Sequence, residues 1–295
     1  MTAEMLQQHL KSGTTHLCQC WLLERQDGFR LGFTDHDQMI TFAGNSFLPH
    51  HGLTAQALAE TTGLSVNNSE AIGVLQSDAI TEADINAGRY DNAVVTAWLV
   101  QWDAPDARQI KFRGTFGEMT RSSGGFQVEL RGLTEALNSP TGHSYQRSCR
   151  AVLGDEECQF DVADPAYAVE TKIAQRLNEN VLIFESLPQF APQWFDYGSI
   201  QMLSGNAAGL KGVIKADHVL AGDRREITLW LPLQAQVVVG DEVRLRAGCD
   251  KRLVTCRTKF DNLLNFRGFP NIPGEDWLVS VPRSGTPLDG GSLNG

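Results

Sequence analysis

Short apolar runs of strand length recur along most of this chain, and residues typical of turns separate them. Gln26-Asp27-Gly28 and Gly44-Asn45 each lie between two such runs, which predicts two β-hairpins. The expected helices are few and short, at residues 1–12, 81–88 and 257–264. The sequence therefore predicts a mainly β protein with a minor α component. The expected strands are residues 17–24, 29–34, 39–42, 47–48, 93–102, 110–118, 126–130, 168–177, 181–184, 198–203, 212–217, 227–231 and 243–246.

The length of the chain, 295 residues, is large for one hydrophobic core and suggests two domains. The cluster Asn138-Ser139-Pro140-Thr141-Gly142 is the best candidate for a boundary between them. We expect an N-terminal β-rich domain at 1–140, a C-terminal β-rich domain at 141–281, and a flexible tail rich in Gly, Ser and Pro at 282–295. Two β-rich domains of similar size also leave room for a duplicated fold, although there is no strict internal repeat.

The formal net charge of −10 argues against a surface that binds nucleic acid, because such surfaces neutralise phosphates with Lys and Arg. The charge is compatible with a channel wall that nucleic acid passes without binding. No apolar run approaches the roughly 20 residues of a membrane-spanning helix, and the run at 227–239 is interrupted by Gln234 and Gln236. Because the N-terminal residues lack a secretory signal, we expect reduced thiols and metal ligation rather than disulfides.

Four of the six cysteines form two pairs in polar surroundings, where a cysteine with only a packing role is not expected. Cys249 and Cys256 have basic neighbours, which are expected to favour the thiolate that binds metals. Cys149 and Cys158 lie far upstream. Four thiolates can complete a tetrahedral zinc site or hold an iron–sulfur cluster. The basic neighbours of the downstream pair are Lys251, Arg252, Arg257 and Lys259.

The spacing within the two cysteine pairs does not identify a metal by itself. Eight residues separate the first pair and six the second, which is wider than in a zinc knuckle. The compact cysteine run of bacterial ferredoxins is also missing. Spacing alone therefore leaves open the alternative of four unrelated buried cysteines.

Two further groups of candidate ligands have simpler interpretations. Cys18 and Cys20 alternate along an apolar strand, so we interpret them as core-facing residues. Asp35, His36 and Asp37 cannot converge on one ion from an extended strand, because alternate side chains point to opposite faces. We expect a turn in which the Asp side chains bond to the backbone. The chain contains no phosphate-binding glycine motif and no nucleophile elbow.

Several segments resemble a family of phage-type tail proteins. The block Gly248-Cys249-Asp250-Lys251, Cys256, Asn265-Phe266-Arg267-Gly268-Phe269-Pro270 and Ile272-Pro273-Gly274 is similar to the C-terminal signature of this family. The family includes the baseplate hub protein of bacterial gene transfer agents, and tail-tip proteins of long-tailed phages look similar in the same block. Segments around Cys149 and Cys158, and those at 20–37 and 77–91, are also similar. The resemblance runs from about Cys18 to Gly274.

The resemblance implies a structural hub at the tip of a tail and not an enzyme, so no catalytic residue is expected. Such hubs are commonly homotrimers, and they lie between a ring of distal tail proteins and a central fibre or megaprotein. The implied protein assembles in the bacterial cytoplasm and becomes part of the baseplate of a virion or gene transfer agent. The resemblance implies neither membrane insertion nor sequence-specific nucleic-acid binding, although DNA passing through the ring is compatible with it.

Related tail-tip proteins carry a [4Fe–4S] cluster held by four cysteines. The matching cofactor- and metal-binding positions here are Cys149, Cys158, Cys249 and Cys256. Such a cluster would crosslink the beginning of the second domain to its end and fix the shape of that domain. A structural zinc module is the first alternative. A metalloenzyme using the thiolates with His36 or an Asp is the second, although four thiolates would saturate a catalytic zinc.

Residues close to the downstream cysteines are expected to support a cluster. Asn262, Asn265 and Arg267 could donate hydrogen bonds around it or rigidify the loop, and we expect Phe266 and Phe269 to shield it from water. A symmetry argument adds one hypothesis. Two similar β domains in each of three subunits would present six near-equivalent faces, which would mate a sixfold tube to a threefold tip.

Overall fold

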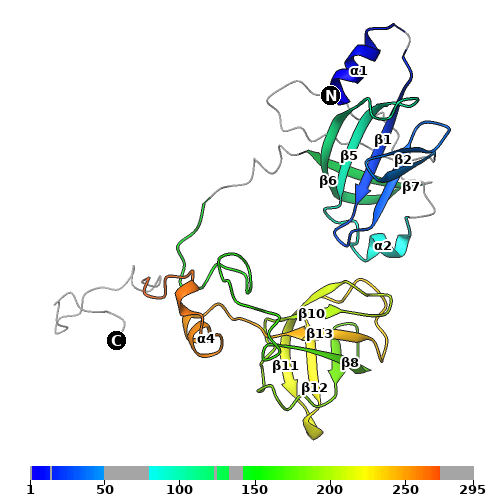
Figure 1. The fold of residues 1–295 in the computed structure, drawn as a ribbon. Coiled ribbons are helices and arrows are strands. Elements are labelled where there is room, and N and C mark those ends of the chain that lie inside the picture. The colour runs from blue at the N-terminus through cyan, green and yellow to red at the C-terminus, as the bar shows by residue number, and fades with distance from the viewer. Residues whose placement is uncertain (1, 14, 50–79, 123–124, 133–141, 273–295) are drawn as a thin grey trace, which may run out of the picture. The chain divides into compact units, whose positions relative to one another are not determined.

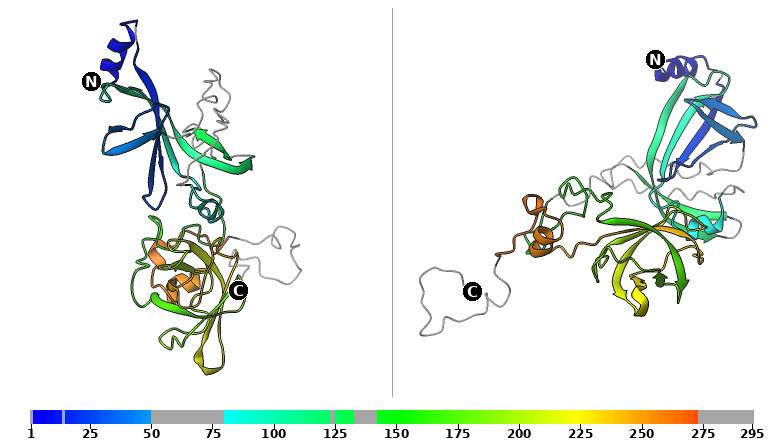
Figure 2. Two further views of the ribbon diagram at one scale, coloured as in Figure 1. Left: turned by 90° about the vertical axis from the view of Figure 1, so that its right-hand side faces the viewer. Right: turned by 60° about the horizontal axis from the view of Figure 1, so that its bottom comes forward.

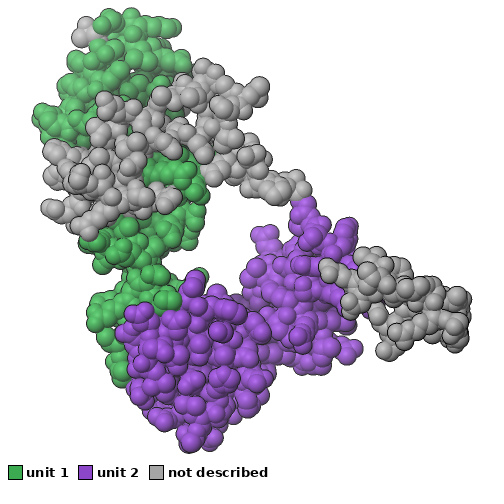
Figure 3. Space-filling view, turned by 180° about the vertical axis from the view of Figure 1, so that it is seen from behind, with its two compact units in different colours: residues 1–141, 201–211, 232–242 green, residues 142–200, 212–231, 243–295 purple. Residues whose placement is uncertain are grey.

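The computed structural model describes residues 2–13, 15–49, 80–122, 125–132 and 142–272. Within these residues the protein is mainly β with a few short helices, as predicted. The chain divides into two compact units, which are coloured separately in Figure 3. The first comprises residues 1–141, 201–211 and 232–242, and the second comprises residues 142–200, 212–231 and 243–295. The boundaries expected at 140 and 281 stay a prediction, and the expected tail at 282–295 lies outside the described residues.

The strands that precede residue 133 form one seven-stranded sheet in the order β3-β4-β2-β1-β5-β6-β7 (Figure 1). Neighbouring strands are antiparallel except β2 and β4, which pair in parallel. Both predicted hairpins form, β1 with β2 and β3 with β4. In the second hairpin Ala43 and Gly44 both have positive φ, as a type I′ turn requires. The strands are β1 Leu17–Glu24, β2 Arg30–Thr34, β3 Ile40–Phe42, β4 Asn45–Pro49, β5 Val94–Gln101, β6 Arg108–Ser122 and β7 Gly125–Gly132, and the helices are α1 Thr2–Leu10 and α2 Glu82–Asn86.

Strand β1 lies inside this sheet and buries side chains on both of its faces. Trp21 and Leu23 belong to one apolar cluster, while Cys18 and Cys20 belong to another. This division follows from the alternation of side chains along a strand. Cys18 and Cys20 are 4% and 0% exposed, so the prediction that they face the core is confirmed.

The strands that follow residue 167 form a closed six-stranded barrel in the order β10-β11-β12-β9-β8-β13. Closure removes the unpaired edges that an open sheet would leave. Helix α4 and the turn η3 follow the barrel in sequence, and Figure 1 and the right-hand view of Figure 2 show α4 (orange) outside the barrel. The elements are β8 Ala168–Arg176, β9 Val181–Phe184, β10 Ser199–Met202, β11 Lys211–Val219, η2 Ala221–Asp223, β12 Arg225–Leu229, β13 Glu242–Arg246, α4 Leu253–Thr258 and η3 Leu263–Asn265.

Two predictions about these elements are wrong. The helix expected at 257–264 begins earlier, at Leu253, and ends at Thr258. Asp261 has a φ of +44°, outside the right-handed helical region, so the helix cannot continue to Leu264. The idea of a duplicated fold also fails, because an open sheet with one parallel pair and a closed barrel differ in strand order and closure. The hypothesis of six near-equivalent faces therefore loses its basis.

A buried ion pair fixes the loop that precedes β10 to the barrel. Arg225 and Asp217 are 1% and 0% exposed, and one guanidinium nitrogen of Arg225 lies 3.1 Å from both carboxylate oxygens of Asp217. Arg225 also donates to the backbone oxygens of Leu187, Phe190 and Ala191 at 3.3, 2.6 and 3.0 Å. Because a buried guanidinium needs partners for its N–H groups, these bonds fix the course of residues 187–196.

Candidate metal centre

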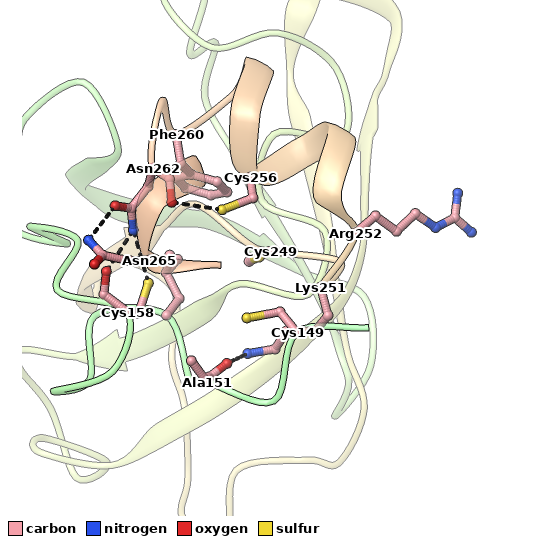
Figure 4. A pocket seen from close by; sticks show the side chains of 11 residues that line it. Cys149, Ala151, Cys158, Cys249, Lys251, Arg252, Cys256, Phe260, Asn262 and Asn265 are labelled. Atoms are coloured by element: carbon pink, nitrogen blue, oxygen red, sulfur yellow. Dashed lines mark hydrogen bonds between the residues drawn. The ribbon is translucent and has the colours of Figure 1, made fainter. Parts of the chain in front are cut away.

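The four cysteines at 149, 158, 249 and 256 line a single pocket (Figure 4). The space between the atoms of its walls is about 330 Å³, a value that includes open solvent. In Figure 4 the sulfur atoms of Cys149, Cys158 and Cys256 point toward its interior. Residues far apart in the sequence therefore come together here, as the hypothesis of a shared site requires. The other residues that line the pocket are Ala151, Leu153, Lys251, Arg252, Phe260, Asn262 and Asn265.

Asp155 shapes the turn that presents Cys158. One of its carboxylate oxygens accepts from the backbone N–H groups of Cys158 and Glu157 at 2.7 and 3.0 Å, and the other accepts from Val152 N–H at 2.7 Å. The N–H of Cys158 contributes most to lowering the pKa of Asp155 below its usual range. The carboxylate is therefore directed at its own backbone. Cys149 is held from the other side, because its backbone N–H donates to the Lys251 carbonyl at 2.8 Å.

Cys249 is placed by the close approach of two backbone segments. A Cβ atom on Gly248 would lie 1.7 Å from the Asp196 carbonyl oxygen and 2.3 Å from the Gly198 nitrogen. Only glycine allows the chain to leave β13 along this path and to place Cys249 at the pocket. Cys256 lies in the middle of α4, where its backbone N–H donates to the Arg252 carbonyl at 3.0 Å.

Two lysines tie the cysteine segments to surrounding backbone. Lys259 Nζ donates to the carbonyl oxygens of Trp194 and Gly248 at 2.6 and 2.9 Å, and it lies 4.5 Å from the centre of the Trp194 ring. Lys251 Nζ donates to the Ala151 carbonyl oxygen. Because residues 187–196 are fixed by Arg225, Lys259 connects the cysteine segments to the barrel.

Burial outweighs basic neighbours in setting the state of the thiols. Burial raises the pKa of Cys249, and Lys251 opposes this shift only in part. The pKa of Cys256 rises to about 11, first through burial and then through the charges of the other three cysteines of the pocket. Lys251 therefore favours the Cys249 thiolate as expected, but burial outweighs it, and no basic residue is among the causes of the shift at Cys256. Arg252 illustrates the reason, since its side chain is 81% exposed and water screens its charge.

All six cysteines lie in the described part of the chain, and all are free thiols. Four of them surround one pocket, and the charges of the other three oppose ionisation of Cys256. Bound cations are the usual compensation for buried thiolates, and a coordinating thiol loses its proton. The donor set therefore fits a metal group held by sulfur.

The arrangement also bears on the size of that group. Among the described residues, no three His, Cys, Asp or Glu side chains are arranged to hold a single metal ion. Four thiolates around one zinc ion must come within about 3.8 Å of one another, since each Zn–S bond is about 2.3 Å long. In an iron–sulfur cluster the cysteines bind different iron atoms, so their sulfurs lie farther apart. How closely the four sulfurs approach one another therefore distinguishes the two groups.

Polar residues downstream of α4 contact the cysteines. Asn262 Nδ2 lies 2.6 Å from the Cys158 carbonyl oxygen and 3.5 Å from Cys158 Sγ. The backbone N–H of Arg267 donates to Cys149 Sγ at 3.3 Å, and Asn265 Nδ2 donates to Asn262 Oδ1 at 2.8 Å. Hydrogen bonding by this segment was predicted, but Arg267 contributes its backbone rather than its guanidinium.

The prediction that Phe266 and Phe269 shield the site from water is wrong. Neither Phe266 nor Phe269 lines the pocket. Phe269 is 42% exposed and packs on Tyr145, with ring centres 4.8 Å apart. Phe260 lines the pocket instead and is itself buried, with its ring 4.9 Å from that of Phe160. The sequence shows that the apolar residue Phe260 follows Cys256 closely. It does not show how the chain turns after Phe260, which depends on the left-handed backbone conformation of Asp261.

Asp35 and His36, from the second group of candidate ligands, form hydrogen bonds with the backbone. Asp35 Oδ1 accepts from the Gln19 N–H at 2.6 Å, and His36 Nδ1 accepts from the Gln38 N–H at 3.0 Å. Asp35 therefore bonds to the backbone as predicted, although its partner lies on β1. His36 belongs to the first compact unit, and the four cysteines of the pocket belong to the second.

Comparison with known proteins identifies the class. The family described as "Baseplate hub protein, N-terminal attachment domain" matches residues 3–161, and the family described as "Phage conserved hypothetical protein BR0599" matches residues 193–276. The first match covers more than half of the chain, so the protein belongs to the baseplate hub proteins of phage-type tails. This confirms the family that the sequence motifs indicated. No curated protein matches the chain.

One solved structure is similar over nearly the whole length. It is a chain of the "Virion of native gene transfer agent (GTA) particle", with 51% sequence identity and a TM-score of 0.88. The match covers 98% of this chain and 99% of that chain. The predicted class, a structural component of the baseplate of a phage-like particle, is therefore confirmed. No described helix is long and apolar enough to cross a membrane.

Proposed function

We propose that this protein is a structural hub that joins the distal tail protein ring to the central tip or fibre protein, and that an iron–sulfur cluster fixes the shape of its second unit. The observation that carries the cluster is the meeting of four cysteines at one pocket, although up to 106 residues separate them in the chain. Membership of the baseplate hub family supports the role at the tail tip.

Cys149, Cys158, Cys249 and Cys256 would be the ligands. A bound [4Fe–4S] cluster would supply a covalent crosslink between the segment that precedes the barrel and the segment that follows it. The protein's own residues contribute the geometry. Asp155 and Gly248 position two of the ligands, and Lys259 ties the downstream segment to the barrel.

The role we propose is not enzymatic. Four thiolates would leave no open coordination position for a substrate, and a catalytic metal needs such a position. None of the described residues that line the pocket is a His, Asp or Glu that could act as a base. A structural zinc module remains the alternative, since four thiolates can also complete a tetrahedral zinc site.

We further propose a homotrimer as the assembled form. The net charge of −10 suits a wall along which DNA passes without binding. Imaging of an intact particle tests both the trimer and the neighbours. Three copies between a ring of distal tail proteins and a central fibre are expected, whereas another stoichiometry or another position would refute this part.

Metal analysis tests the cluster. Protein purified without oxygen should be brown, absorb near 400 nm (an approximate value for thiolate–iron charge transfer) and contain iron. Cys249→Ser should lose most of that iron, because one of four ligands is removed. Cys18→Ser is the matched control and should keep it, since Cys18 lies in the core of the N-terminal sheet. Colourless wild-type protein that contains zinc would favour the alternative, and unchanged iron in Cys249→Ser would exclude Cys249 as a ligand.

A further inference from the structure

Asn262 contacts both of the segments that carry the cysteines. Its side-chain Nδ2 lies 2.6 Å from the carbonyl oxygen of Cys158 and 3.5 Å from its Sγ. Its backbone N–H donates to the Cys256 carbonyl at 3.0 Å, and its own carbonyl lies 3.3 Å from Cys256 Sγ. A single residue therefore connects a ligand that precedes the barrel to a ligand that follows it (Figure 4).

The orientation of the Asn262 amide is fixed by its partners. The Cys158 carbonyl can only accept a hydrogen bond, so the atom 2.6 Å from it must be the NH₂ group. The other end, Oδ1, accepts from Asn265 Nδ2 at 2.8 Å. With both ends satisfied, the NH₂ group stays directed at Cys158 and its sulfur.

We propose that Asn262 is a positioning residue of the four-cysteine site, which holds Cys158 at the pocket before metal binds and donates an N–H to its sulfur when the metal is bound. The first part needs no cofactor and stands on the contacts alone. The second part rests on the proposed iron–sulfur cluster. Hydrogen bonds to cluster sulfurs stabilise negative charge, and the reduced cluster carries more of it, so they raise the reduction potential.

Cys149 provides an internal reference for testing this role. Its sulfur also receives an N–H, at 3.3 Å, but the donor is the backbone of Arg267. Substituting the side chain of Asn262 leaves that donor in place. A change confined to Cys158 therefore reports on Asn262, whereas a change in both thiols reports a general loss of structure.

The experiment compares full-length wild-type protein with Asn262→Ala, Asn262→Asp and Gln159→Glu. Asn262→Asp keeps the shape of the side chain but removes the N–H groups. Gln159→Glu is the control, since Gln159 follows Cys158, is exposed, and makes the same change from amide to carboxylate without contacting a sulfur. In metal-free protein, alkylation by iodoacetamide is followed at each cysteine by mass spectrometry. In iron-loaded protein, the midpoint potential is measured.

The rates are compared over a pH series, so that differences in thiolate fraction are removed. At equal thiolate fraction, both Asn262 variants should alkylate Cys158 severalfold faster than wild type and Gln159→Glu, with Cys149 unchanged. Unchanged labelling of Cys158, or a parallel rise at all four thiols, would overturn the positioning role. The midpoint potential of Asn262→Ala should shift to a more negative value than that of wild type, and an unshifted potential would overturn the N–H donation to sulfur. If the wild type takes up no iron, the proposed cluster fails, and the labelling of metal-free protein still decides the positioning role.

Discussion

Backbone packing at single residues decides where the ligands of the candidate metal centre lie. Cys249 reaches the pocket because Gly248 lets two backbone segments pass within a distance that no side chain tolerates. Cys158 is held by the three N–H groups that converge on Asp155. Gln159 and Lys251, which lie close to two of the ligands, have positive φ. Such non-glycine residues cost about 1–3 kcal/mol each and cluster at functional sites.

Gly248→Ala should disrupt the centre. Its Cβ would lie 1.7 Å from the Asp196 carbonyl oxygen, so the backbone must move and displace Cys249. We expect a loss of about 1–3 kcal/mol or more in the free energy of unfolding, together with reduced iron content. Chemical denaturation and metal analysis measure the two effects.

Gly209→Ala is the matched control. Nothing lies within 4 Å of a Cβ at this position, although its φ of +86° adds backbone strain. It should lower stability by about 1–2 kcal/mol and leave the iron content unchanged. Equal iron content in the two variants would refute the role given to Gly248.

At the scale of elements, the barrel and the cysteine segments are connected through one loop. Arg225 on β12 fixes residues 187–196, and Lys259 bonds to the Trp194 carbonyl within that loop. The phenolic O–H of Tyr167 adds a second connection by donating to the Lys259 carbonyl at 2.8 Å. The barrel therefore serves as the rigid support on which α4 and its cysteine are held.

Arg225→Met tests the importance of this support. It leaves the carboxylate of Asp217 buried without its ion-pair partner, and such a loss typically costs about 3–5 kcal/mol. Arg244→Met is the control, because the ion pair between Arg244 and Glu170 is exposed and should contribute about 0–1 kcal/mol. Urea denaturation measures both variants, and similar losses in the two would contradict the role of the buried pair.

At the scale of the whole molecule, the cluster we propose would close a long loop. Cys158 and Cys249 are 91 residues apart, and all six strands of the barrel lie between them. A crosslink over that length restricts the unfolded chain, and the chain-entropy estimate for a disulfide of similar span is about 4–5 kcal/mol. A structural cluster should therefore stabilise the second unit as a whole.

Removal of iron should lower the thermal stability of the protein. The expected loss is of the order of the crosslink, about 4–5 kcal/mol, and calorimetry of iron-loaded and iron-free protein measures it. Cys18→Ser should show the same difference between the two forms, since that thiol lies outside the pocket. An unchanged melting temperature after iron removal would refute a structural role for the cluster.

Local patterns predicted most of the secondary structure because their causes are local. Residues 17–24 and 181–184 were placed with the bounds that β1 and β9 have. The predicted position of the α4 helix was wrong because the end of the helix depends on the positive φ of Asp261. Asp tolerates a positive φ, but its presence in a sequence does not indicate one. Phe260 was missed for the same reason, since the direction of the chain after α4 decides which aromatic ring meets the pocket.

The sequence by itself determined the β-rich class, the family and the identity of the four paired cysteines, because strand alternation, turn residues and motifs are written in short segments. Only the tertiary structure decided that an open sheet and a closed barrel are different folds, and that the four thiols meet at one pocket. It also decided that burial, more than nearby lysines and arginines, governs the ionisation of Cys249 and Cys256. These properties depend on which segments, distant in the sequence, pack together and exclude water. The spacing of residues along the chain does not determine that packing.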